Sequence, residues 1–139
     1  MERQRRVLMR DHPPSAWFVV DEMALGRVVG SAEIMTAQMR RLAAVAAMPE
    51  VTMQVIPAVA HPANASGFLV ADDSAWCEHV AGGYVFTGGE TVPLLLRLFD
   101  SLRSESYRAS ESAAMIEEAG ELWSAGVSPL TRTATAGTA

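Results

Sequence analysis

The sequence predicts a mixed α/β (α+β) fold, with a small mixed sheet that includes a β-meander, packed by about three main helices. Three observations support this prediction: a short apolar run at 16–21, strict alternation at 51–57, and helical spacing of apolar residues in three longer segments. With 139 residues the chain can bury a core as one domain. We expect that domain to span 1–126, and 127–139 to be a disordered tail because SPLTRTATAGTA has no periodicity.

The first third of the chain is predicted to form a helix, a strand and a second helix. Residues 2–10 have the pattern of a short helix that the following prolines end. The run WFVV has the composition of a buried strand at about 16–21. Ser31 then serves as the N-cap of an amphipathic helix, with Glu33 in its first turn and Pro49 after its end.

The middle of the chain carries the remaining strands. VTMQVIP at 51–57 alternates apolar and polar side chains, as a half-buried strand does. The stretch GFLVADDSAWCEHVAGGYVFTGG predicts a three-stranded meander. Its strands lie at about 67–71, 75–80 and 84–87, and its turns at Asp72-Asp73-Ser74 and Gly82-Gly83.

Two helices are predicted to complete the domain. The first would be capped by Thr91, and its apolar stripe contains Leu94, Leu95, Leu98, Phe99 and Leu102. The second would be capped by Ser110 and end before Gly126, and its stripe contains Met115, Ile116, Ala119, Leu122 and Trp123.

Composition excludes several classes of function. The net charge of −5 argues against direct binding of nucleic acid by this chain. No apolar run is long enough to span a membrane, and the single cysteine, Cys77, cannot form an internal disulfide. We therefore expect a cytoplasmic protein that binds no membrane.

Asp21 and Glu22 follow the first strand directly and allow three interpretations. A carboxylate where a buried strand ends is a common catalytic position, because the sheet edge opens into a crevice there. Alternatively, Asp21 caps the next turn, or the pair belongs to a surface that another molecule recognises.

Other chemistry-bearing residues form no recognisable motif. The three histidines are scattered, and neither CxxC nor HExxH occurs, so we expect no metal and no cofactor. Strand alternation places Cys77 and His79 on one face, opposite Glu78, which suggests a nucleophile pair only weakly. Gly82-Gly83 and Gly88-Gly89 lack the Lys-Ser/Thr of a phosphate loop.

Several stretches together resemble the antitoxin-like C-terminal domain of actinobacterial XRE-type helix-turn-helix transcriptional regulators. These stretches are RQRRVL, VVDEMALGRVVGSAEIMTAQMRRL, VTMQVIP, GFLV, CE and FDSLRSESYRASESAAMIEE, and they cover the chain up to about residue 124. The positions that match most visibly are Arg3, Gln4, Asp21, Glu22, Leu25, Gly30, Met35, Gln38, Gln54, Pro57, Gly67, Phe68 and Glu78.

The resemblance implies a regulatory domain that binds a small partner protein or a ligand, and it brings no catalytic residues. Family members begin with a DNA-binding head, whereas this chain begins close to its RQ motif, so we expect that it lacks the head. It would be a fragment or a stand-alone domain. The family pattern favours reading the two acids after the first strand as junction residues that line a pocket or a partner surface.

We therefore expect a non-enzymatic regulatory domain that contacts a small partner protein, a helix-turn-helix regulator or a small-molecule ligand, with homodimerisation left open. Its binding residues would lie near the sheet end, and they are Asp21, Glu22, His61, Glu78, Arg3, Arg6, Trp17 and Trp76. The alternative is a stand-alone domain recruited as a cyclase or acid/base enzyme in bacterial secondary metabolism. Its apolar pocket would be lined by Trp17, Trp76, Tyr84 and Phe86.

Overall fold

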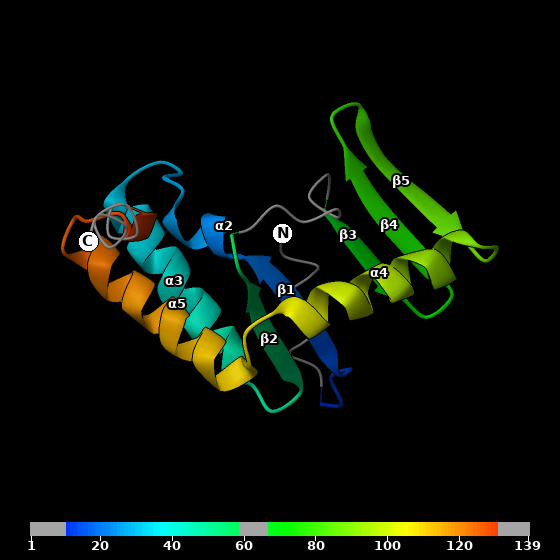
Figure 1. Cartoon of the computed structure of the whole chain (residues 1–139), viewed down its shortest axis with the longest axis horizontal. Coiled ribbons are helices and arrows are strands. Elements are labelled where there is room, and N and C mark those ends of the chain that lie inside the picture. The colour runs from blue at the N-terminus through cyan, green and yellow to red at the C-terminus, as the bar shows by residue number, and fades with distance from the viewer. Residues whose placement is uncertain (1–10, 59–66, 131–139) are drawn as a thin grey trace. The chain divides into compact units, whose positions relative to one another are not determined.

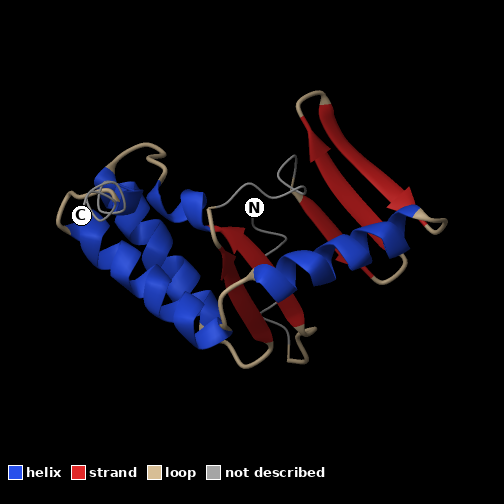
Figure 2. Ribbon diagram, viewed as in Figure 1, coloured by secondary structure: helices blue, strands red, loops and turns tan. Residues whose placement is uncertain are grey.

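The structure is a computed structural model that describes residues 11–58 and 67–130. These residues form four helices and five strands, so the predicted α+β class is confirmed (Figure 2). The chain divides into two compact units. Unit 1 contains Met1–Pro57 and Tyr107–Ala139, and unit 2 contains Ala58–Ser106. The strands accordingly form two sheets, one in each unit.

Unit 1 is a two-stranded parallel sheet packed by helices. Its strands pair in register from Ala16↔Val51 to Asp21↔Ile56. Figure 1 shows the two long helices of this unit running antiparallel, on the same side of the sheet. The elements are β1 (Ala16–Asp21), α2 (Glu22–Gly26), α3 (Ala32–Ala46), β2 (Val51–Ile56) and α5 (Ala109–Ser124).

The hydrophobic core of unit 1 lies between these helices and β2. The predicted alternation of β2 is confirmed, because Val51, Met53 and Val55 are all buried. The core also contains Leu25, Met35, Met39, Ile116, Ala119 and Trp123. In contrast, β1 is less buried than its composition predicted. Trp17 is 54% exposed, because only the opposite face of the strand, with Phe18 and Val20, packs against the core.

The helix ends in unit 1 follow known capping patterns, with one correction. Ser31 Oγ accepts a hydrogen bond from the amide of Ile34, which confirms the predicted cap of α3. Ser110 does not cap α5: the helix begins at Ala109, and the amide of Arg108 donates to the Glu111 carboxylate at 2.9 Å. At the other end, Gly126 has φ +73° and closes a Schellman motif.

Residues 127–130, the first part of the predicted tail, lie against α2. Ser128 Oγ donates a hydrogen bond to the carbonyl of Gly26 at 2.8 Å. The side chain of Leu130 lies where a Cβ on Gly26 would be, so only glycine fits there in α2 without displacing it. Residues 131–139 lie outside the described residues.

Unit 2 is the predicted antiparallel meander, with one helix packed on it. The strands are β3 (Phe68–Ala71), β4 (Ser74–His79) and β5 (Gly82–Thr87), in that spatial order, and the helix is α4 (Thr91–Glu105). The second turn was predicted wrongly. Val80 and Ala81 make it, and Gly82-Gly83 begin β5 instead.

Two details of α4 also differ from the prediction. The residue before the helix is Glu90, so Thr91 is the first helical residue and does not cap it. Of the predicted stripe, Leu94 is 57% exposed, while Val92 is the buried residue of this helix. No helix in the described part of the chain is long and apolar enough to cross a membrane.

Candidate binding surfaces

The junction between β1 and α2 uses Asp21 as a structural cap. Asp21 Oδ1 accepts a hydrogen bond from the amide of Met23 at 2.8 Å, and the Asp21 backbone is extended, as an N-cap requires. Glu22 follows as a half-buried residue in the first turn of α2. Of the three interpretations of this acidic pair, the geometry of Asp21 matches the cap.

The residues just after the cap connect this junction to the core. Leu25 is buried, and its carbonyl accepts a hydrogen bond from Trp123 Nε1 at 2.8 Å. The short helix α2 is therefore fixed by α5. This hydrogen bond anchors the β1–α2 junction to the core of unit 1.

Strand alternation divides the meander of unit 2 into two faces. Residues paired across an antiparallel sheet point to the same side, so the register assigns each side chain to a face. Ala75 is 2% exposed, which identifies its side as the one that α4 covers. This face, which we call the covered face, carries Phe68, Val70, Ala75, Cys77, His79, Tyr84 and Phe86. Its cover is partial, because Tyr84 and Phe86 on β5 remain 53% and 39% exposed.

The opposite side, which we call the open face, carries a row of exposed apolar side chains. Leu69 pairs with Trp76, and Trp76 pairs with Val85, so the three lie side by side across all three strands. Their exposed fractions are 53%, 39% and 71%. Glu78 lies on the same face beside this row. Among the described residues, this is a contiguous apolar patch on a regular sheet.

Gly83 shapes the centre of the open face. A Cβ at this position would collide with the indole Nε1 and Cε2 atoms of Trp76. The indole therefore lies against the bare backbone of β5, which holds its orientation while leaving one side of the ring exposed. An ordered aromatic ring costs little conformational entropy when it is covered by a partner.

The aromatic pocket predicted for an enzyme does not form within unit 2. Trp76 lies on the open face, whereas Tyr84 and Phe86 lie on the covered face, so these three cannot line one cavity. Cys77 and His79 share a face, as predicted, but His79 Nδ1 accepts a hydrogen bond from the amide of Ala81. The described residues contain no cluster of three metal-ligating side chains.

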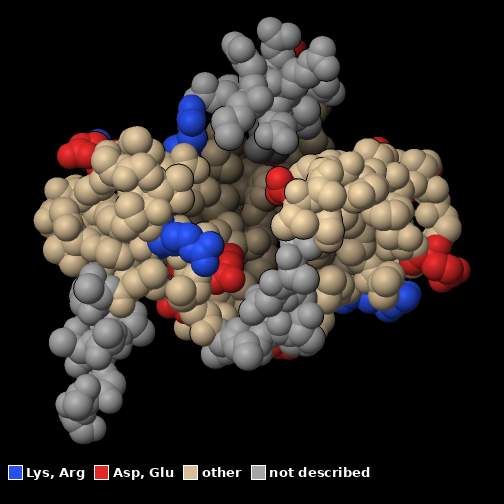
Figure 3. Space-filling model, turned by 90° about the horizontal axis from the view of Figure 1, so that it is seen from above, with Lys and Arg blue, Asp and Glu red and all other residues tan. Residues whose placement is uncertain are grey.

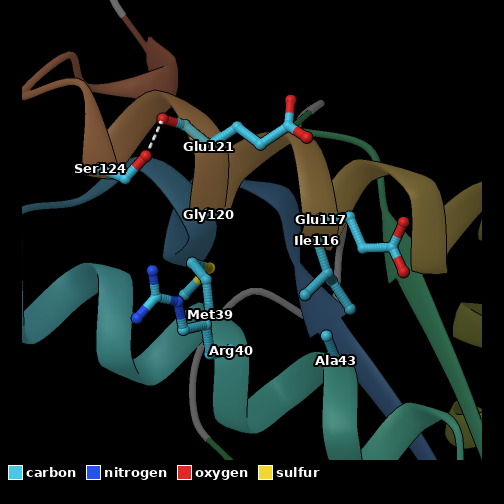
Figure 4. A pocket seen from close by; sticks show the side chains of 8 residues that line it. All are labelled: Met39, Arg40, Ala43, Ile116, Glu117, Gly120, Glu121 and Ser124. Carbon is cyan, nitrogen blue, oxygen red and sulfur yellow. Dashed lines mark hydrogen bonds between the residues drawn. The ribbon is translucent and has the colours of Figure 1, made fainter.

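A shallow groove runs along the seam between α3 and α5 in unit 1. Its floor is formed by Met39, Ile116 and Gly120, and charged side chains of both helices stand at its rim (Figure 4). The groove holds about 200 Å³, below the roughly 300 Å³ at which small-molecule pockets begin. A Cβ on Gly120 would lie 3.3 Å from Met39 Cβ, so the groove marks close helix packing.

Charged side chains form no large patch on the face of the molecule that Figure 3 shows. In the view of Figure 3 they form small groups, in some of which both signs lie together, and most of the visible surface is uncharged. Arg103 and Asp100 form an ion pair of 3.3 Å within α4. Hydrogen bonds from Ser31 and from its own backbone amide lower the pKa of Glu33 at the start of α3. Neither feature gathers into a charged binding patch.

The predicted binding residues are thus distributed as follows. Trp17, Asp21 and Glu22 belong to β1 and α2 of unit 1, and Trp76 and Glu78 share the open face of unit 2. Arg3, Arg6 and His61 lie outside the described residues. Leu69 and Val85 were not among the binding residues predicted from the sequence. The signal for them was present, because FLVA and GYVFT carry apolar residues on both faces of their strands.

The chain belongs to the family described as Domain of unknown function (DUF5753), whose model matches residues 1–118. The match covers all of unit 2 and unit 1 as far as residue 118, which lies within α5. No curated protein and no solved structure matches the chain.

Proposed function

We propose that this DUF5753 chain is a cytoplasmic regulatory domain that works by binding another protein through the open face of unit 2. The partner is a helix-turn-helix regulator of the XRE type or a small regulatory protein. The observation that carries the proposal is the exposed row Leu69–Trp76–Val85, which lies across all three strands on the face of the sheet opposite to α4.

This row has the properties of an interaction centre. Exposed contiguous apolar side chains lose contact with water when a partner covers them, which favours the complex. Tryptophan is among the residues that most often dominate such interfaces. Glu78 at the edge of the row supplies the polar rim that such a surface needs to stay soluble and to orient a partner.

The resemblance of the sequence to regulator domains supports the class of partner. It implies a C-terminal domain of actinobacterial, antitoxin-like transcriptional regulators that binds a small partner protein or a ligand. The acidic net charge of −5 supports a role through protein contact, with DNA bound by the partner and not by this chain.

The described residues favour neither an enzyme site nor a small-molecule site. Asp21 and Glu78 are both exposed, whereas a carboxyl that serves as a general acid near neutral pH usually needs burial. The groove between α3 and α5 is shallow, and the aromatic residues of unit 2 are divided between two faces.

The test is capture of the partner from the native host, followed by quantitative binding. The tagged full chain is isolated from a lysate of its own host, and native mass spectrometry identifies what is bound. The captured protein is then purified, and its affinity is measured for the wild-type chain, for Trp76→Ala and for Trp17→Ala. Trp17 is the matched control, because it is also an exposed tryptophan but lies in unit 1.

We expect a helix-turn-helix or small regulatory protein whose Kd rises about tenfold or more with Trp76→Ala and about twofold or less with Trp17→Ala. The reverse order of effects would place the binding surface at the β1–α2 junction and contradict the proposal. A bound metabolite without any protein partner would also contradict it and would favour a ligand-binding domain.

A further inference from the structure

Strand β5 forms an edge of its sheet and is unusually accessible. The spatial order β3-β4-β5 leaves one side of β5 without a strand among the described residues. All six residues of β5 are exposed, including Tyr84 at 53% and Val85 at 71%. An exposed apolar edge strand is a template for pairing with another chain.

The register shows which backbone groups point outward. His79 and Gly82 flank a two-residue turn, and the amide of Gly88 donates to the carbonyl of Asp73. Hydrogen-bonded and non-hydrogen-bonded residue pairs alternate along an antiparallel ladder, and these two ends fix which pairs are hydrogen-bonded. The residues of β5 whose backbone groups bond to β4 are therefore Gly82, Tyr84 and Phe86. The amides and carbonyls of Gly83, Val85 and Thr87 therefore face away from the sheet.

The strand lacks the features by which edges usually avoid pairing. Natural edge strands carry lysine, proline, a bulge or an inward-pointing charge. From Val80 to Gly89 this chain has neither a charged residue nor a proline. The strand therefore offers no charge that would select an oppositely charged peptide, and none that would repel an identical strand.

We propose that β5 pairs antiparallel with β5 of a second copy of this chain, so that two three-stranded sheets join across a twofold axis. One register pairs all the outward-facing backbone amides and carbonyls of β5 with those of the other copy. In this register the twofold axis lies at Val85, which faces Val85 of the other copy. Gly83 of each copy then faces Thr87 of the other, and Tyr84 faces Phe86. This proposal goes beyond the proposed function and does not depend on it.

The side chains of β5 fit this register on both faces. Thr87 is small enough to stand opposite Gly83, where the Trp76 indole already occupies the space above the backbone. On the other face, Tyr84 and Phe86 form cross-strand aromatic pairs, which are among the favourable neighbours in antiparallel sheets. The two Val85 side chains meet at the axis and join the apolar rows of the two open faces.

The experiment measures self-association of the full chain by sedimentation velocity over a wide concentration range, without any partner. The test variant is Val85→Lys, which places two like charges directly opposite each other at the axis. Leu69→Lys is the matched control, because Leu69 lies on the same face with similar exposure but on the other edge strand. Val85→Glu is made as well.

We expect the wild-type chain to form dimers, and Val85→Lys to raise the dimer Kd by about tenfold or more. Leu69→Lys should change it by about twofold or less. Mixing Val85→Lys with Val85→Glu should restore dimers, because opposite charges then face each other, and this shows that both variants are folded.

Three outcomes would overturn the proposal. The first is a wild-type chain that stays monomeric at every concentration. The second is disruption of the dimer by Leu69→Lys as strong as that by Val85→Lys. The third is failure of the mixture of the two Val85 variants to restore dimers. A wild-type monomer that binds an added peptide along β5 would identify the edge as a peptide site instead and would equally contradict self-pairing.

Discussion

The two units of the chain differ in how completely their apolar side chains are buried. In unit 1, large side chains such as Ile116, Met39 and Trp123 are buried almost completely between α3, α5 and β2. In unit 2, the buried hydrophobic residues that the structure describes are only Ala75 and Val92, while Trp76 and Val85 remain exposed. Burial of apolar area is the main source of stability, so unit 1 supplies most of it.

This difference indicates a division of roles. A domain selected only for stability would cover the apolar row of unit 2 or replace it with polar residues. Unit 2 instead exposes apolar side chains on a regular sheet. Because Gly83 has no Cβ, the Trp76 indole can lie flat against the backbone of β5. We infer that unit 1 maintains the fold and unit 2 presents the surface.

The largest expected effect comes from comparing one buried tryptophan with one exposed tryptophan. Trp123→Ala should lower the free energy of unfolding by about 3–5 kcal/mol, because it opens a cavity and leaves the buried Leu25 carbonyl without its donor. Trp76→Ala should lower it by about 1 kcal/mol or less, since the indole is partly exposed. Urea denaturation followed by circular dichroism measures both. Equal losses would contradict the division of roles.

A smaller effect is expected at a buried hydroxyl that connects β2 to α5. Ser112 is completely buried, and its Oγ accepts a hydrogen bond from the amide of Val55 at 2.9 Å. Ser112→Ala leaves that buried amide unpaired and should cost about 1–3 kcal/mol. Ser104→Ala is the control, because Ser104 makes only an exposed bond to its own helix, and it should change stability by about 0.5 kcal/mol or less. Thermal denaturation of both variants measures these changes in stability.

The acidic junction should behave as a helix cap. Asp21→Ala removes the acceptor for the Met23 amide and should cost about 0.5–2 kcal/mol, whereas Asp21→Asn or Asp21→Ser should recover most of it. Chemical denaturation measures the three variants. If Asn and Ser were as damaging as Ala, the carboxylate would have a role other than capping.

The smallest effect concerns Glu33 in the first turn of α3. Hydrogen bonds from Ser31 and from its own amide hold the pKa of this exposed carboxyl below its usual value. A lowered pKa in the folded state means that its contribution to stability is present above the unfolded pKa and is lost as pH falls through the folded pKa. Carboxyl chemical shifts in an NMR pH titration should show the low pKa, and Ser31→Ala should raise it. An unchanged pKa in that variant would remove Ser31 as the cause.

The sequence predicted unit 1 well because its signals are local and periodic. The alternation of Val51, Met53 and Val55 and the spacing of Ile116, Ala119 and Trp123 are enough to identify these residues as core. The cap at Ser31 also follows from local pattern. Ser110 failed as a cap because Glu111 can bond the amide of Arg108, which lets the helix begin earlier.

The candidate surface was harder to predict, because it depends on which face of a sheet is covered. Leu69 and Val85 look like core residues by composition, but they lie on the face opposite to α4 and are exposed. The Gly82-Gly83 pair is typical of a turn. In the structure the two glycines begin β5, and the Trp76 indole packs against Gly83. That contact joins residues on two different strands.

Amide hydrogen exchange of the wild-type chain, alone and with its purified partner protein, tests the central claim most directly. In the free chain, we expect the slowest amides in α3, β2 and α5, with faster exchange in the meander. Binding should add protection within β3, β4 and β5 and leave the β1–α2 junction unchanged. New protection at Asp21–Leu25 without any change in 68–87, or a meander more protected than α5 in the free chain, would contradict the account.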